Sequence, residues 1–203
     1  MTKLDEKQII KIFQSGFGNK KFVSEDVETF QIGKNFGVIK TDTLVASTDV
    51  PPKMSLVDVA RKSVVASISD FAAKGVRPLY CIISVSMPKN FSKSKVEQLA
   101  RGFKIASDEF GFRILGGDTN QAKELVISVT LVGMAGKITP RNGSHVGDVI
   151  MVTGPFGLYL NRGCPTCSNF FGIQVGLDVT FDDSDFDFIF KLVYRPCQNR
   201  CLA

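Results

Sequence analysis

Residues 112–130 read FRILGGDTNQAKELVISVT and combine two apolar runs with a polar break between them. Ile114 and Leu115 form the first run, which ends in Gly-Gly-Asp-Thr at 116–119, and a second run begins at Leu125. Short apolar runs bounded by glycine and polar residues are typical of buried strands. The stretch therefore predicts two strands, with two glycines and a carboxylate at the end of the first.

Two helices with clear start signals precede this stretch. Ser55 opens a capping box, which predicts a helix that runs to about Lys74. Ser94 opens a second capping box, and apolar residues at helical spacing then continue to Gly111. Strands are expected between and around these helices, at 30–32, 36–40, 41–50, 79–88, 125–133 and 148–154. Strands that alternate with two helices predict an α/β or α+β domain over roughly 23–154.

The composition is that of a folded protein with a core. The 203 residues are 44% hydrophobic, include 17 Phe and are 22% charged, which argues against disorder. The net charge is +5, but the basic residues are scattered, so nucleic-acid binding is not expected. No apolar run reaches the roughly 20 residues of a membrane span. The amphipathic N-terminus lacks the apolar centre of an export signal, and we expect a cytoplasmic protein without membrane contact.

The helix that begins at Ser55 carries an unusual polar face. Ser63, Ser67, Asp70 and Lys74 follow one another at spacings of four, three and four, which places them on one side. This face is either a solvated stripe or a surface that meets a polar partner. Small serines weaken the first interpretation, because solvated faces usually carry Glu, Lys and Gln.

Four carboxylates stand at strand ends or on this helix: Asp26, Asp42, Asp70 and Asp118. Singly, Asp26, Asp42 and Asp118 are interpreted as turn or cap residues. Together they could hold Mg²⁺ with bound phosphates, because that ion prefers hard oxygen ligands. Gly116 and Gly117 would allow the backbone to approach a phosphate closely. The chain has no Walker A pattern and no G-x-G-x-x-G dinucleotide fingerprint.

Five segments, in this order along the chain, carry a resemblance to a known family. They are SEDVE (24–28), KTDTLVASTDVPPKM (40–54), ARKSVVASISDFAAKGVRPL (60–79), ILGGDTNQAKELVISVTLVG (114–133) and GDVIMVTGPFG (147–157). They resemble the archaeal type of thiamine-monophosphate kinase. The wider superfamily includes aminoimidazole-ribonucleotide synthetase, selenophosphate synthetase and the hydrogenase-maturation dehydratase. The resemblance implies the N-terminal domain of this fold, a mixed sheet with two main helices that dimerises through a shared β-barrel.

The reaction that the resemblance implies is Mg²⁺-assisted transfer of the ATP γ-phosphoryl group to thiamine monophosphate. The acceptor phosphate is largely ionised at neutral pH because its second pKa is about 6, so no catalytic general base is expected. His145, the only histidine, is interpreted as a turn residue. The resemblance implies metal ligands at Asp26, Asp42, Asp70 and Asp118, nucleotide contacts at Thr43, Gly117 and Asp118, and an acceptor-pocket residue at Asp49. Asp26 matches the second carboxylate of the family's Gly-Asp-Asp, with Ser24 and Glu25 in place of its first two residues.

A homodimer is expected on two grounds. Residues 79–88 and 124–133 are apolar on both alternations, more than one helix layer can cover. In the family, the equivalent strands pair across a two-fold axis.

Asp42, Asp70 and Asp118 are expected to converge on one Mg²⁺-nucleotide site.

The likeness stops near Gly157, where the family's chains continue into a second domain with an Asp-x-Ser-Asp-Gly-Leu motif. The expected organisation is an N-terminal helix and loop at 1–22, an ATP-binding and dimerisation domain at 23–157, and an aberrant Cys-rich tail at 158–203. Cysteines at 164, 167, 197 and 201 could bind Zn²⁺, but a shifted reading frame or truncated gene product explains the change better.

Two functional hypotheses follow. The first is an ATP-dependent thiamine-monophosphate kinase, and the second is a non-catalytic dimerisation and nucleotide-binding remnant. Another ATP-dependent member of the superfamily, similar to selenophosphate synthetase or aminoimidazole-ribonucleotide synthetase, is a further alternative. Without the second domain, weak Mg-ATP binding and little turnover are expected.

Overall fold

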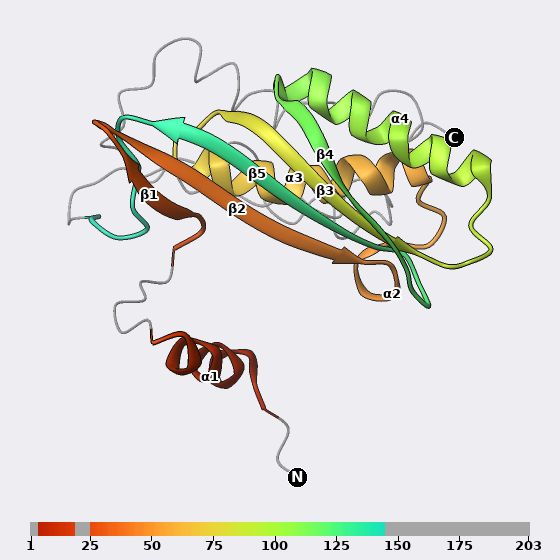
Figure 1. The fold of residues 1–203 in the computed structure, drawn as a ribbon, viewed down its shortest axis with the longest axis horizontal. Coiled ribbons are helices and arrows are strands. Elements are labelled where there is room, and N and C mark those ends of the chain that lie inside the picture. The colour runs from red at the N-terminus through yellow and green to blue at the C-terminus, as the bar shows by residue number, and fades with distance from the viewer. Residues whose placement is uncertain (1–3, 19–24, 145–203) are drawn as a thin grey trace.

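The computed structural model describes residues 4–18 and 25–144, and Figure 1 shows their arrangement. The expected strand at 148–154, His145, the tail cysteines and the tail at 158–203 lie outside the described residues. The elements follow one another as α1 (Glu6–Phe17), β1 (Glu28–Ile32), β2 (Asn35–Val45), α2 (Ala46–Asp49), α3 (Leu56–Ala73), β3 (Pro78–Met87), α4 (Lys93–Phe110), β4 (Arg113–Gln121) and β5 (Val126–Ala135).

The two long helices begin at serine caps. The Ser55 side chain accepts a hydrogen bond from the Asp58 amide, and α3 ends at Ala73 with Lys74 as its C-cap, close to the predicted end at about Lys74. The predicted start of α4 at Ser94 is wrong by two residues. The N-cap is Ser92, whose backbone is extended and whose side chain accepts a hydrogen bond from the Lys95 amide. Gly111 ends α4 in the left-handed conformation, as predicted.

The mixed sheet confirms the expected fold class. Within the described residues it has five strands in the order β1-β2-β5-β3-β4, and β3 and β4 pair in parallel while the other neighbours are antiparallel. A parallel pair needs a crossover, and α4 supplies it between β3 and β4. The two runs at 36–40 and 41–50 join into the single 11-residue strand β2 and the short helix α2.

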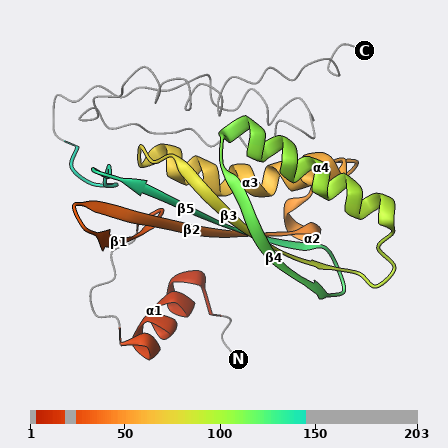
Figure 2. The same ribbon diagram turned by 45° about the horizontal axis from the view of Figure 1, so that its top comes forward.

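Helices α3 and α4 both lie on one face of the sheet (Figure 2). The hydrophobic core lies between these helices and the sheet. Val38, Ile68, Phe71, Ile127 and Leu131 are fully buried there. Burial alternates along β5, as expected for a sheet with one covered face. We call the covered side the helix face and the opposite side the open face.

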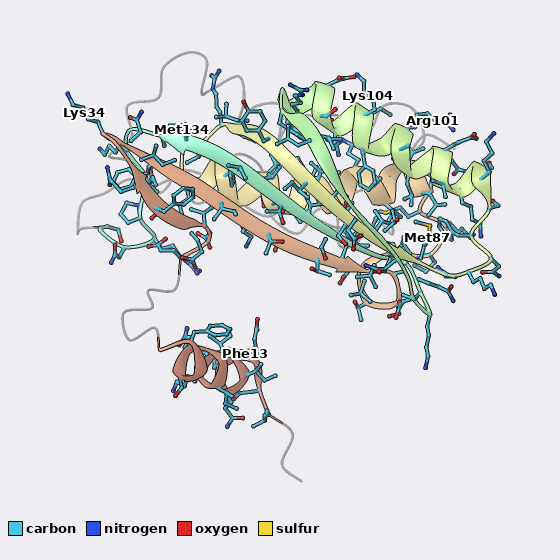
Figure 3. All side chains as sticks on the ribbon, viewed as in Figure 1. Phe13, Lys34, Met87, Arg101, Lys104 and Met134 are labelled. Carbon is cyan, nitrogen blue, oxygen red and sulfur yellow. The ribbon has the colours of Figure 1, made fainter. Side chains whose placement is uncertain are left out.

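The open face carries large apolar side chains at one end of the sheet. Ile39, Tyr80, Ile82 and Met134 are each between 36% and 47% exposed. Met134 and the β1–β2 turn residue Lys34 lie at the same end of the sheet (Figure 3). α1 buries none of its side chains, and none of the described helices has the length and apolar character that crossing a membrane demands.

Strand β4 does not end at the glycines, contrary to the prediction. It continues through them to Gln121, and Leu115 forms a bulge because Cys81 pairs with Ile114 while the next residue of β3 pairs with Gly116. A Cβ at Gly117 would lie 1.7 Å from the Ile83 carbonyl oxygen. Gly117 is therefore required by the close approach of two strand backbones, a reason that involves no ligand.

Candidate functional site

Asp42 and Asp70 come together on the helix face, from β2 and α3. Their side chains meet at Lys40, whose Nζ lies 2.6 Å from Asp70 Oδ2 and 3.5 Å from Asp42 Oδ1. The Ser67 hydroxyl, fully buried one turn before Asp70, donates to Asp42 Oδ2 at 3.4 Å. The polar stripe of α3 thus meets a polar partner, the carboxylate of β2. We call Lys40, Asp42, Ser67 and Asp70 the acidic cluster.

The acidic cluster has more negative charge than its lysine neutralises. Burial raises the pKa of Asp70, the Asp42 and Asp26 carboxylates raise it further, and Lys40 only partly opposes them. Burial also works against the charged form of Lys40, but Asp70 and Asp42 outweigh it and raise the pKa of that ammonium. The raised pKa of Lys40 and the raised pKa of Asp70 have one explanation. Two carboxylates stabilise the single ammonium, but one ammonium does not fully compensate two carboxylates.

Asp26 lies in a second charged group at the end of α3. The Lys74 ammonium, whose side chain is only 2% exposed, pairs with Glu25 and lies 3.2 Å from Asp26 Oδ2. Arg141 Nη1 lies 3.5 Å from the other oxygen of Asp26. Because Asp70 and Lys74 are one helical turn apart, this group borders the acidic cluster.

Asp118 does not join these carboxylates within one chain. Asp42 pairs with Val129, Val129 pairs with Ile83, and Ile83 pairs with Gly117. Paired residues point to the same face, so the side chain of Asp118, one residue further, points to the open face. The predicted convergence of all three carboxylates in one chain is wrong. Among the described residues, no three His, Cys, Asp or Glu side chains gather at one metal-ion position, so Asp42 and Asp70 form a pair of carboxylates.

The predicted nucleotide contacts lie on both faces of the sheet: Gly117 belongs to the helix face, and Thr43 and Asp118 belong to the open face. Thr43 lies on the open face, where its hydroxyl is 2.9 Å from that of Ser128. Ser128 pairs with Ser84, and Ser84 pairs with Asp118, so a row of polar side chains crosses this face. Asp118 is exposed and accepts a hydrogen bond from Asn120 Nδ2 at 2.6 Å.

Asp49, the predicted acceptor-pocket residue, is tied to its own turn. Its carboxylate accepts the Val45 amide at 2.7 Å, and its carbonyl accepts the Lys62 ammonium. Burial lowers the pKa of Lys62, opposed by the Asp49 carboxylate. This arrangement fixes α2 against α3.

Sequence reasoning missed Lys40 as a site residue. Its signal was present, because Lys40 stands two residues before Asp42 on a strand and therefore points to the same face. A lysine on the covered face of a sheet needs a buried anionic partner. The sequence predicts Lys74 on the same face of α3 as Asp70, but it gives no sign of the partners at 25 and 26, which are distant along the chain.

The fold and the acidic cluster define a class of protein. Residues 24–135 match the family described as AIR synthase related protein, N-terminal domain, and the chain belongs to this family. Within it, the chain is 62% identical over 157 residues to a thiamine-monophosphate kinase of Nitrosopumilus maritimus, a match that covers 77% of this chain and 50% of that protein. It is 32% identical, with the same coverage, to the thiamine-monophosphate kinase of Pyrococcus horikoshii.

A solved structure shares the fold. AaThiL complexed with AMPPCP and TMP superposes with a TM-score of 0.70 at 24% identity, over 76% of this chain and 50% of that one. The chain thus spans about half the length of the relatives that it matches.

Proposed function

We propose that this chain supplies the N-terminal half of an ATP-dependent thiamine-monophosphate kinase, which converts thiamine monophosphate into thiamine diphosphate. The observation that carries the proposal is the acidic cluster, where Asp42 and Asp70 share one cation between β2 and α3. Support comes from the 62% identity to a protein named for this activity. A cluster of partly buried carboxylates suits phosphoryl transfer, because this reaction is catalysed mainly by positioning the substrates and by neutralising the charge of the phosphates.

The residues of the acidic cluster fit Mg²⁺. The donors are carboxylate and hydroxyl oxygens, which that ion prefers, and a cation already lies between two of them. Asp42 and Asp70 would hold the ion, with Asp26 beside them. Bound Mg²⁺ would neutralise charge on the ATP phosphates. Lys40 adds a positive charge beside these carboxylates.

The other predicted contacts remain part of the proposal. Thr43, Gly117 and Asp118 would contact the nucleotide and Asp49 the acceptor. No general base is assigned, since the acceptor is a phosphate that is already largely ionised at neutral pH, with a second pKa of about 6. We also propose a cytoplasmic location, since ATP is the co-substrate, and a domain that extends from 23 to 157 ahead of a separate tail at 158–203.

A homodimer through the open face completes the proposal. The exposed apolar residues Ile39, Tyr80, Ile82 and Met134 gather there, on a sheet that has no covering layer in the described residues. A second copy of the same sheet would cover them with an isologous contact of well over about 1,000 Å², the scale of stable interfaces. Asp118 lies on this face, so a dimer would place it near the partner copy and not with its own Asp42.

The test uses the 203-residue protein with Mg²⁺, ATP and thiamine monophosphate, and measures thiamine diphosphate. We expect Mg²⁺-dependent binding of a non-hydrolysable ATP analogue and slow turnover, below the roughly one per second that marks an ordinary kinase. Asp42→Asn should abolish both, because the exchange removes a charge that the ion requires. Asp108→Asn, on the exposed side of α4, is the matched control and should leave both intact.

Three outcomes separate the hypotheses. Binding with turnover that depends on Asp42 supports a kinase. Analogue binding without any turnover favours the non-catalytic remnant. Failure of the wild-type chain to bind a Mg-nucleotide at all contradicts the proposal, as does turnover with another acceptor and none with thiamine monophosphate.

A further inference from the structure

Lys40 occupies the position of a cation inside the acidic cluster. Its ammonium lies 2.6 Å from Asp70 Oδ2 and 3.5 Å from Asp42 Oδ1, and its side chain is only 21% exposed. Lys40 projects from β2 onto the helix face, which it shares with Asp42 and with the buried core residues Val38 and Leu44 of the same strand. An ammonium on such a face is accommodated only because two carboxylates compensate it.

The neighbouring lysine provides a useful contrast. Lys74 is 2% exposed and is held by Glu25 and Asp26, with Thr139 bonded to its carbonyl. That lysine fastens a loop to the end of α3 and has no room to leave. Lys40 is less enclosed: its own side chain is 21% exposed, and its contact with Asp42 is long at 3.5 Å.

We propose that Lys40 is the resident counter-cation of the metal site, which holds Asp42 and Asp70 together until a divalent ion displaces its ammonium. This proposal rests on the proposed function. An ammonium and a divalent ion compete for the same carboxylate oxygens, and two uncompensated carboxylates would repel each other. The flexible four-carbon stem of lysine lets the ammonium move away while the strand stays in place.

A purely structural ion pair would behave in the opposite way. If Lys40 only braces the two carboxylates, its removal lets them separate and weakens binding of a divalent ion. If Lys40 competes with the ion, its removal strengthens that binding and makes the protein more dependent on the ion for stability. The sign of the change in affinity therefore decides between the two roles.

The experiment measures binding of Mn²⁺, a spectroscopic substitute for Mg²⁺, to the 203-residue chain without nucleotide, by electron paramagnetic resonance of the free ion. Lys40→Met should tighten the apparent affinity by about tenfold, the scale of one competing charge beside a partly exposed pair. It should also lower the melting temperature without metal and enlarge the rise in melting temperature that Mn²⁺ produces. Lys40→Arg keeps the charge and should not tighten binding.

Lys104→Met is the matched control. Lys104 pairs with a single aspartate, Asp108, on the outer surface of α4, where its side chain is 71% exposed (Figure 3). The substitution Lys104→Met removes the same positive charge as Lys40→Met, but from an ion pair outside the acidic cluster. Its Mn²⁺ affinity should equal that of the wild type, so a general effect of net charge would be recognised.

Asp70→Asn separates this proposal from the proposed function. One outcome overturns only the role of Lys40: the wild type binds Mn²⁺, Asp70→Asn abolishes that binding, and Lys40→Met binds no more tightly than the wild type. Absence of Mn²⁺ binding in both the wild type and Lys40→Met overturns the metal site and the role of Lys40 together. Binding by Lys40→Met alone, or tighter binding by it, supports the counter-cation.

Discussion

Single residues set the charge balance of the acidic cluster. Asp70 is stabilised by Lys40 but is also buried beside two other carboxylates, and the net result is a raised pKa. A group whose pKa is higher in the folded state than in the unfolded state binds a proton more tightly when folded. Its contribution to stability is therefore present at low pH and is lost as the pH rises through the folded pKa. The ionised cluster thus lowers the stability of the apoprotein, a cost that a bound cation would offset.

The pH dependence of an Asp70→Asn variant tests this charge balance. Asparagine imitates the neutral carboxyl group, so the variant should be as stable as the wild type below the ordinary pKa of 3.8 and more stable as the pH rises above it. Thermal unfolding without metal, from about pH 3.5 to about pH 7, measures the difference. A variant that becomes progressively less stable than the wild type toward neutral pH would show that Lys40 outweighs burial.

Cys81 provides a second test at the scale of one residue. Its side chain is fully buried on β3, and burial raises the pKa of its thiol to about 12. The thiolate is the reactive form, so Cys81 should resist alkylation by iodoacetamide near pH 8 in the folded protein and react only after denaturation. Peptide mapping by mass spectrometry reads this residue separately from the tail cysteines. Rapid labelling of native Cys81 would contradict the burial.

At the scale of elements, close backbone approach explains two glycines. α4 packs on α3 at Gly102, where a Cβ would lie 2.3 Å from the Val57 carbonyl oxygen and 2.7 Å from Ala60 Cβ. Gly117 has the same role between β4 and β3. Sequence signals cannot show such a contact, because the partner is far away along the chain. They did predict the helices themselves, since caps and periodicity act within a few residues.

Exchange of Gly102 for alanine tests the contact between α3 and α4. The added methyl group must push the helices apart, so Gly102→Ala should destabilise the protein by about 1–3 kcal/mol, the usual cost of overpacking. Gly16→Ala in α1 is the matched control, because nothing lies within 4 Å of its Cβ position. Helix propensity alone should make that variant neutral or up to about 1 kcal/mol more stable. Urea denaturation measures both, and equal effects would refute the contact.

At the scale of the whole molecule, the open face sets the expected assembly. It joins an apolar end near Met134 to a polar row that includes Thr43 and Asp118. The apolar end suits a partner sheet, while the polar row is where nucleotide contacts are proposed. The separation of Asp118 from Asp42 within one chain is understandable if a second copy takes part in each site.

Ile82→Lys tests the dimer. Ile82 is 47% exposed on the open face, and a lysine there would bring like charges into the isologous interface. Light scattering should show the wild type at about twice 22.2 kDa and the variant near 22.2 kDa. Val96→Lys is the matched control, an apolar residue of α4 with 41% exposure that should leave the dimer intact. A wild-type monomer at micromolar concentration would contradict the assembly.

Local sequence signals predicted the elements and their chemistry: an α/β or α+β domain with two capped helices, a polar face on α3, and carboxylates at 26, 42, 70 and 118. Capping, periodicity and the residue types of a motif are local properties, so they can be read without the fold. Which carboxylates meet depends on long-range strand pairing and helix packing, which no local signal reports. The bulge at Leu115 and the parallel register of β4 on β3 direct Asp118 to the open face, because neighbouring residues of a strand point to opposite sides. The same long-range packing brought Lys40 between Asp42 and Asp70.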